Sequence, residues 1–370
     1  MNAYKRLKWQ RISATTAVLA LLLAACGAEE PDESPQDEAD GTDTEEAAAD
    51  DDDGDEPDEA PDAADEPRTL NFGHIYDPAA PYHVCGVEEV AAYVEEHSDS
   101  LTLNLFPSAQ LGNQPEMAEQ MSAGELELGS VGYPILADQY EPIGVLGANY
   151  VFIDADHGEA ILETDLVAEL EQGVLEAANL RTLGHWYEGQ RHVTSNVPIR
   201  EPEDLRGLQF RAPGSGVMLE NAKSLGADPI AMALGEVYLA MQQGLVDAQE
   251  NPLPTIQTQG FHEVQDYLSL TGHRILFTAM VVSEDVWQTL SEAQQQVISD
   301  AIEYATPLVR DCTEEDEESI LAEWEAEGAI EIIDDVDREA FAARSEEHLL
   351  EVFGDVWGDR YLEIRAQANG

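Results

Sequence analysis

The first part of the globular chain alternates between short apolar runs of period two and longer runs of helical period. The short runs predict strands, which span residues 70–75, 101–105 and 126–131. A helix is expected over residues 82–97, and its inward positions are Val84, Val87, Val90 and Val94. A second helix, with Met117 and Met121 on one face, ends at Gly124. This alternation is typical of an α/β lobe built on a mainly parallel sheet.

The next part of the chain continues the alternation and predicts a second lobe. A helix is expected over residues 155–175, a short one over 237–243, and a loop at Asn251. Four further strands are predicted at residues 180–185, 192–195, 267–270 and 275–282. The last two are candidates to pass between the lobes.

The carboxyl-terminal part predicts one long helix across both lobes. Its pattern begins at Glu284 and runs towards Trp324, with Pro307 inside it. Proline removes a backbone donor, so we expect a kink there. A final strand over residues 329–333 and a closing helix from Asp337 brace this helix.

Pattern and composition together divide the chain into five parts. The signal (1–25) and a tether (26–68) come first; lobe I takes 69–188 and 277–316, lobe II takes 189–276, and 317–370 packs across both.

The amino terminus carries a secretory signal. Four basic residues precede an apolar run over residues 17–25 that is too short to cross a bilayer as an ordinary helix. The sequence Leu-Ala-Ala-Cys-Gly at the end of this run, residues 23–27, resembles the bacterial lipobox, whose cysteine is lipidated and becomes the first mature residue. We therefore expect an extracytoplasmic protein anchored to the cell membrane by lipid on Cys26. The alternative is an ordinary signal peptide with a chance cysteine.

The segment from Gly27 to Pro67 is predicted to be a disordered tether. It has no basic residue, and 21 of its positions are Asp or Glu. Such a segment buries too little apolar surface to offset its ordering entropy, and its charges repel one another. Calcium binding at residues 50–53 is conceivable, although a charge run of this kind is more often only solvated.

The globular part is strongly acidic as well. From Thr69 onward it carries 56 acidic and 12 basic residues, and Lys223 is the only lysine after the signal. This balance is typical of a protein held in high salt, where screening weakens self-repulsion. It argues against nucleic acid or an anionic membrane surface as a partner.

The cysteines leave two possibilities open. If Cys26 carries lipid, Cys85 and Cys312 remain as a pair in an oxidising compartment, where a disulfide can form. Two separate buried thiols are the alternative. Neither cysteine has the spacing of a metal site.

The candidate ligand site lies between Phe210 and Leu253. Arg211 ends a short apolar segment, and its planar guanidinium matches a carboxylate in two parallel hydrogen bonds. Arg191 stands in a similar setting at a strand edge. The polar cluster after the helix contains Gln249, Glu250 and Asn251, and the candidates for the pocket wall include Tyr133, Trp186, Tyr187 and Leu234. For each arginine, a surface salt bridge is the simpler alternative.

Several motifs resemble the extracytoplasmic solute-binding proteins of TRAP transporters, of the DctP type. They are Gln249 to Pro252, Glu236-Val237-Tyr238, Gly207-Leu208 through Arg211 and Pro213, and Phe106-Pro107 with Leu111-Gly112. The resemblance runs from about Leu70 to the end. It implies a two-lobed periplasmic-binding-protein-like α/β fold with crossing strands, closing on an organic acid, with the membrane subunits of a TRAP transporter as partners.

The resemblance also assigns roles to residues. Arg211 is similar to the family arginine that pairs with the ligand carboxylate, and Arg191 and Asn251 to residues that bind the same group. Leu234 stands where members often carry an aromatic residue that packs on the ligand, and Ala248 replaces a common glycine. Both are departures from the pattern.

Enzymes form the competing class. The chain lacks a phosphate-binding glycine loop, a zinc helix and a GxSxG elbow, so no cofactor and no metal site is predicted. A hydrolase that uses Glu236 and Glu250 as a carboxylate pair is a weaker alternative, since Glu236 at a helix start is explained by the helix dipole. A sensor subunit for a signalling partner is a third possibility that sequence cannot separate from transport.

Overall fold

The structure, a computed structural model, describes residues 66–367 and is built on a nine-stranded mixed sheet. The strand order is β2-β1-β3-β8-β4-β7-β5-β6, and β9 pairs with β8. The strands are β1 (Arg68–Gly73), β2 (Leu101–Phe106), β3 (Leu128–Gly132), β4 (Leu180–Ser195), β5 (Gln209–Ala212), β6 (Asp228–Ala231), β7 (Ala248–Pro252), β8 (Tyr267–Ser283) and β9 (Glu331–Ile333). Parallel pairs lie towards both ends, whereas β3, β4, β7 and β8 meet in antiparallel pairs. The α/β class predicted from the sequence is confirmed.

Two long strands, β4 and β8, run through both halves of the sheet. The sequence predicted each of them as two short strands, which was wrong: β4 has 16 residues and β8 has 17. They pair from Leu180 opposite Ser283 to Ser195 opposite Tyr267, with three register shifts. The first two shifts each insert one residue in β4, and the third places residues 270–273 of β8 opposite His192 alone, so the apolar alternation changes face along the strands. In the sequence, such a change of face looks the same as the boundary between two separate strands.

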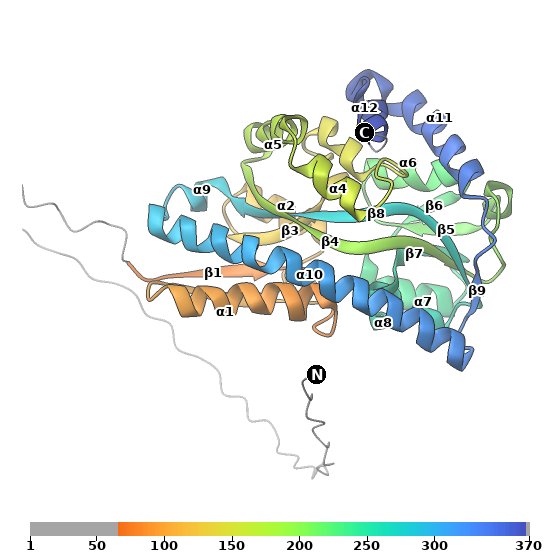
Figure 1. Ribbon diagram of the computed structural model, residues 1–370, viewed down its shortest axis with the longest axis horizontal. Helices are drawn as coiled ribbons and strands as arrows, with labels where there is room; N and C mark the ends of the chain where they lie inside the picture. The colour runs from red at the N-terminus through yellow and green to blue at the C-terminus, as the bar shows by residue number, and fades with distance from the viewer. Residues whose placement is uncertain (1–65, 368–370) are drawn as a thin grey trace, which may run out of the picture. The chain divides into compact units, whose positions relative to one another are not determined.

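Helices cover both faces of the sheet (Figure 1). In Figure 1, α4, α5, α6 and α11 lie on one side, and α1, α8 and α10 lie on the other. The α-helices are α1 (Glu88–His97), α2 (Gln114–Ser122), α3 (Tyr133–Leu136), α4 (Ala155–Leu162), α5 (Asp165–Ala178), α6 (Gly216–Leu225), α7 (Val237–Gln242), α8 (Leu253–Thr258), α9 (Glu284–Trp287), α10 (Glu292–Glu327), α11 (Arg338–Trp357) and α12 (Arg360–Gln367). Short 3₁₀ turns occur at Glu141–Gly147, Pro202–Leu205, Leu234–Glu236 and Phe261–Glu263.

The 36-residue helix α10 is the long element predicted to lie across the molecule. Its first half packs Ile298, Ile302 and Val309 into one apolar core, and its second half packs Ile320 and Trp324 into another. The predicted start at Glu284 was wrong because the separate turn α9 comes first. Ser291 then caps α10: its hydroxyl accepts from the Gln294 N–H at 3.1 Å, and the Gln294 side chain accepts from the Ser291 N–H at 3.2 Å.

Three more sequence expectations are corrected. The helix predicted over residues 155–175 is two helices, α4 and α5, since the chain breaks at Glu163 and Thr164. Val84 is exposed, because residues 82–87 form a π-helix whose wider turn shifts the phase of the inward positions. Asn251 lies on strand β7 and not in a loop.

A disulfide joins the π-helix to α10 through Cys85 and Cys312, which are 227 positions apart in the sequence. No helix within residues 66–367 is both long and apolar enough to cross a membrane. The signal, the lipidation at Cys26 and the acidic tether up to residue 65 fall outside the described residues, and Arg68, predicted to end the tether, begins β1. The described residues 66–367 belong to one compact unit, and the division into lobes I and II stays a prediction.

Candidate functional site

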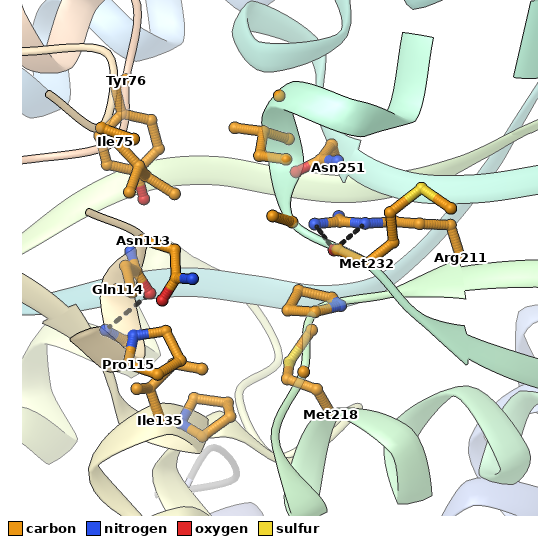
Figure 2. A pocket seen from close by; sticks show the side chains of 18 of the residues that line it. Ile75, Tyr76, Asn113, Gln114, Pro115, Ile135, Arg211, Met218, Met232 and Asn251 are labelled. Carbon is orange, nitrogen blue, oxygen red and sulfur yellow. Dashed lines mark hydrogen bonds between the residues drawn. The ribbon is translucent and has the colours of Figure 1, made fainter. Parts of the chain in front are cut away.

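A cavity of about 790 Å³ lies between two sets of loops above the middle of the sheet. One side comes from the turn after β1, the start of α2 and α3; the other comes from β5, the loop after β6, and β7. Strands β4 and β8 supply Arg191, Arg274, Leu276 and Thr278. Figure 2 shows Asn113 and Gln114 on one side and Arg211 and Asn251 on the other. We call Arg191, Arg211, Arg274 and Asn251 the arginine wall, and Asn113, Gln114, Glu116 and Glu119 the α2 wall.

Arg211 is held at the cavity by backbone atoms. It lies on β5, and its Nε and Nη2 atoms donate to the carbonyl of Met232 at 3.0 and 2.9 Å (Figure 2). Among residues 66–367, its Nη1 atom has no hydrogen-bond partner. Burial lowers the pKa of Arg211 to about 10, with the Glu250 charge acting in the opposite direction. A buried cation oriented by a neutral acceptor is suited to an incoming anion.

Arg191 and Glu250 form a buried ion pair behind the cavity. The Arg191 Nη2 atom donates to Glu250 Oε1 at 2.7 Å and to Asn251 Oδ1 at 3.0 Å, and its Nε atom donates to Glu250 Oε2. Burial acts to raise the pKa of Glu250, but the charges of Arg191 and Arg274 outweigh it and hold that pKa well below its ordinary value. Glu250 is therefore a carboxylate counter-ion, 4% exposed.

Gln249 fixes the amide of Asn251. The Asn251 Nδ2 atom donates to Gln249 Oε1 at 2.5 Å, and Gln249 Nε2 donates to Thr194 Oγ1 at 2.8 Å. Asn251 Oδ1 accepts from Arg191, so the amide orientation is determined and one N–H remains for a bound group. Gln249 itself is fully buried and does not line the cavity, contrary to the prediction that it contacts the ligand.

Two predicted wall residues lie elsewhere. Tyr133 is buried in the core beside α5, and its hydroxyl is 2.6 Å from His185 Nδ1. Trp186 is fully buried in the core under α10, where its indole donates to Thr306 at 3.2 Å. Neither residue lines the cavity, whereas Leu234 does. Both placements depend on contacts with residues far away in the sequence, His185 for Tyr133 and Thr306 for Trp186, and sequence alone does not show them.

The sequence reading missed Arg274 and the α2 wall. Arg274 lies directly opposite Arg191 in the β4–β8 ladder. The only sequence signal for it was a rare basic residue next to the apolar run of β8. The start of α2 had no chemical signal, because its residues are those of an ordinary helix cap: Asn113 Oδ1 accepts from the Glu116 N–H at 3.1 Å, and Glu116 Oε2 accepts from the Asn113 N–H at 2.8 Å.

The carboxylate pair of a hydrolase is not formed. A general acid needs a carboxyl with a raised pKa, but both oxygens of Glu250 accept from Arg191 and its pKa is lowered. Glu236 accepts from the backbone N–H of Ala233 at 3.3 Å. In residues 66–367, no three His, Cys, Asp or Glu side chains are placed to hold a metal ion.

Comparison with known proteins identifies the family. Residues 72–355 match the bacterial extracellular solute-binding proteins, family 7 (DctP), and the chain belongs to this family. It is similar to the sialic acid-binding periplasmic protein SiaP of Vibrio cholerae, with 35% identity over 65% of this chain and 75% of that protein. It is also similar to the 2,3-diketo-L-gulonate-binding periplasmic protein YiaO of Escherichia coli, with 30% identity over 74% and 84%.

Solved structures agree with this assignment. A TRAP periplasmic solute-binding protein of Roseobacter denitrificans with bound 3-deoxy-D-manno-oct-2-ulosonic acid superimposes with a TM-score of 0.77. It is 28% identical, and the match covers 81% of this chain and 99% of that one. A second, from a Polaromonas species and bound to D-erythronate, gives a TM-score of 0.75 at 27% identity, over 80% and 98%. These matches confirm the resemblance and the two-lobed binding-protein fold predicted from the sequence.

Proposed function

We propose that this solute-binding protein captures a small organic acid by its carboxylate and delivers it to the membrane subunits of a TRAP transporter. The observation that carries the proposal is the unpartnered edge of Arg211 beside Arg191 and Asn251, at the end of a large cavity. The relatives support it, because sialic acid, diketogulonate, erythronate and the octulosonic acid are all carboxylic acids.

Three members of the arginine wall meet the carboxylate. Arg211 offers its Nη1 atom, Asn251 offers its remaining amide N–H, and Arg191, whose charge is balanced by Glu250, lines the cavity beside them. A carboxylate in this position loses water, so each charge-assisted hydrogen bond becomes stronger than it is in solution. Because the opposite side of the ligand faces the α2 wall, binding favours approach of the two walls, and the closed form is what a membrane partner recognises.

The predicted features of the amino-terminal part of the chain fit the same role. A lipidated Cys26 holds the protein at the outer face of the cell membrane, and the acidic segment lets the binding unit reach its transporter. The protein then acts as a carrier, as the named relatives do, and Glu250 beside the cavity serves as a counter-ion for Arg191 and Arg274.

Replacing Arg211 tests the proposal. We expect Arg211→Ala to weaken binding of an acid ligand by roughly 2 to 5 kcal/mol, because the buried carboxylate loses its main partner. The ligand comes from a thermal-shift screen of small carboxylic acids in high salt, and calorimetry gives the affinities. The matched control is Arg206→Ala, which removes an exposed arginine on the loop before β5. Unchanged affinity in Arg211→Ala, or no acid that raises the melting temperature, refutes the proposal.

A further inference from the structure

Arg274 is the third buried arginine of the cavity, and its contacts are poor. It lines the cavity with 3% of its surface exposed. Its Nη1 atom donates to the thioether sulfur of Met218 at 3.0 Å, and its Nη2 atom lies 3.4 Å from Glu250 Oε2. Its Nε atom is buried and has no partner among residues 66–367. A thioether is a weak acceptor, so this guanidinium lacks a strong oxygen acceptor of its own.

Glu250 cannot neutralise both of its neighbouring arginines. Arg191 already takes both of its carboxylate oxygens, and His273 Nε2 lies 3.1 Å from Oε2. Burial lowers the pKa of Arg274 to about 10, with Glu250 acting in the opposite direction and Arg191 adding to the lowering. Three arginines thus share one carboxylate counter-ion, and two positive charges, on Arg211 and Arg274, remain for the ligand.

Glu188 does not supply the second counter-ion. Its carboxylate is buried beneath Tyr76 and Thr278, and Arg191 is the arginine whose charge acts on its pKa. Burial raises that pKa to about 7, so Glu188 is partly protonated at neutral pH. On the far side of the cavity, Glu116 and Glu119 repel anions. A second acid group of a ligand is therefore placed best on the same side as the first.

We propose that Arg274 is a specificity-determining residue that binds a second acid group, so that the preferred ligand is a compact diacid with both groups on the arginine wall. The inference rests on the proposed function, since it needs the first acid group to be bound by Arg211. It adds what the family assignment leaves open, because relatives bind acids of different kinds: sialic acid in SiaP, but C4-dicarboxylates in DctP of Rhodobacter capsulatus. Each added charge-assisted contact is expected to favour the diacid by roughly 10- to 100-fold.

The experiment compares diacids with monoacids of the same chain length. The full-length protein is titrated by calorimetry, at one ionic strength, with succinate and butanoate, malate and 3-hydroxybutanoate, and galactarate and galactonate. We expect at least one diacid to bind roughly 10- to 100-fold more tightly than its monoacid partner. In Arg274→Gln, this preference should fall to within about threefold, and Arg274→Lys should restore part of it because it keeps the charge.

The outcomes separate the two proposals. If every monoacid binds as tightly as its diacid, or if Arg274→Gln weakens both members of a pair equally, the role of Arg274 is refuted and that of Arg211 stands. If no acid of either kind binds, the proposed function fails too. Melting temperatures without ligand check the fold; should Arg274→Gln fail to fold, the preference of the native protein and its change in Arg274→Lys decide the question.

Discussion

The two walls of the cavity are built in opposite ways. On the arginine wall, every member is at least nine-tenths buried, and its contacts join residues far apart in the sequence, such as Arg191 and Glu250. On the α2 wall, Glu116 and Glu119 are exposed, and the hydrogen bonds of Asn113 and Glu116 are local ones that cap a helix. The first wall is thus fixed by the fold and suits the acid groups of a ligand. The second can change without disturbing the core, so it is suited to distinguish ligands by their other substituents, such as hydroxyl groups.

The largest predicted effect concerns stability, and it tests whether the arginine wall is built more tightly than the protein surface. Glu250→Gln removes the charge that compensates Arg191 and Arg274, and loss of one partner from a buried ion pair costs about 3 to 5 kcal/mol. We expect a loss of this size in the free energy of unfolding, measured with urea. The matched control is Asp335→Asn, which removes the exposed pair with Arg200, and should cost about 0.5 kcal/mol. Equal losses in the two variants would show that the arginine wall is no more tightly built than the surface.

Replacing Glu188 should give the next largest change in the free energy of unfolding. The pKa of Glu188 is raised, whereas that of Glu250 is lowered. Burial raises the pKa of Glu188 from 4.5 to about 7, although the nearby Thr278 and Tyr76 hydroxyls and the charge of Arg191 oppose this. Neither carboxylate oxygen completes a hydrogen bond with the described residues. The folded protein therefore favours the protonated form. This stabilisation is complete below pH 4.5 and is lost as the pH rises through 7.

Replacing Glu188 by Gln removes that pH dependence. We compare the free energy of unfolding of Glu188→Gln with that of the native protein, taking their difference at low pH as the reference. Relative to that reference, the variant should gain about 3 kcal/mol at pH 8 and less than about 1 kcal/mol at pH 5. Urea unfolding at both values measures the difference. Glu171 and Glu317, whose pKa values burial also raises to about 7, titrate in both proteins and cancel in the comparison. A difference that does not grow with pH would contradict the buried, unpaired carboxyl.

The walls also differ in how far the sequence predicted them. Arg191 and Arg211 could be chosen because basic residues are rare in this chain and both stand at predicted strand edges, and Asn251 because its motif resembles that of the family. Arg274 could not, because its importance comes from pairing with Arg191 across the β4–β8 ladder, 83 positions away. Trp186 and Tyr133 were misplaced for the same reason: Trp186 bonds to Thr306, 120 positions away, and Tyr133 to His185, 52 positions away.

Local signals explain what was right and wrong about the fold. The helical and strand periods gave α1, α2 and β2 because one face of each is buried against a single core. They failed at the junction of α9 and α10, where apolar positions continue in phase and only the Ser291 cap marks the break. The joined strands β4 and β8 depend on pairing with each other, a long-range contact that periodicity does not report.

The smallest effect is expected on the α2 wall, and it sharpens the comparison most. Gln114 is only partly buried, and its side chain accepts one long hydrogen bond, 3.4 Å from the Gly132 N–H. We expect Gln114→Ala to weaken malate binding by about 1 kcal/mol, the net value of one hydrogen bond to a hydroxyl, and to leave succinate nearly unchanged. Arg211→Ala, in contrast, should weaken both acids alike, since both present the same carboxylate. Gln172→Ala, which changes an exposed glutamine on α5, serves as the control for calorimetry. If Gln114→Ala affects the two acids equally, the α2 wall grips the common group as well, and the division of roles between the walls is wrong.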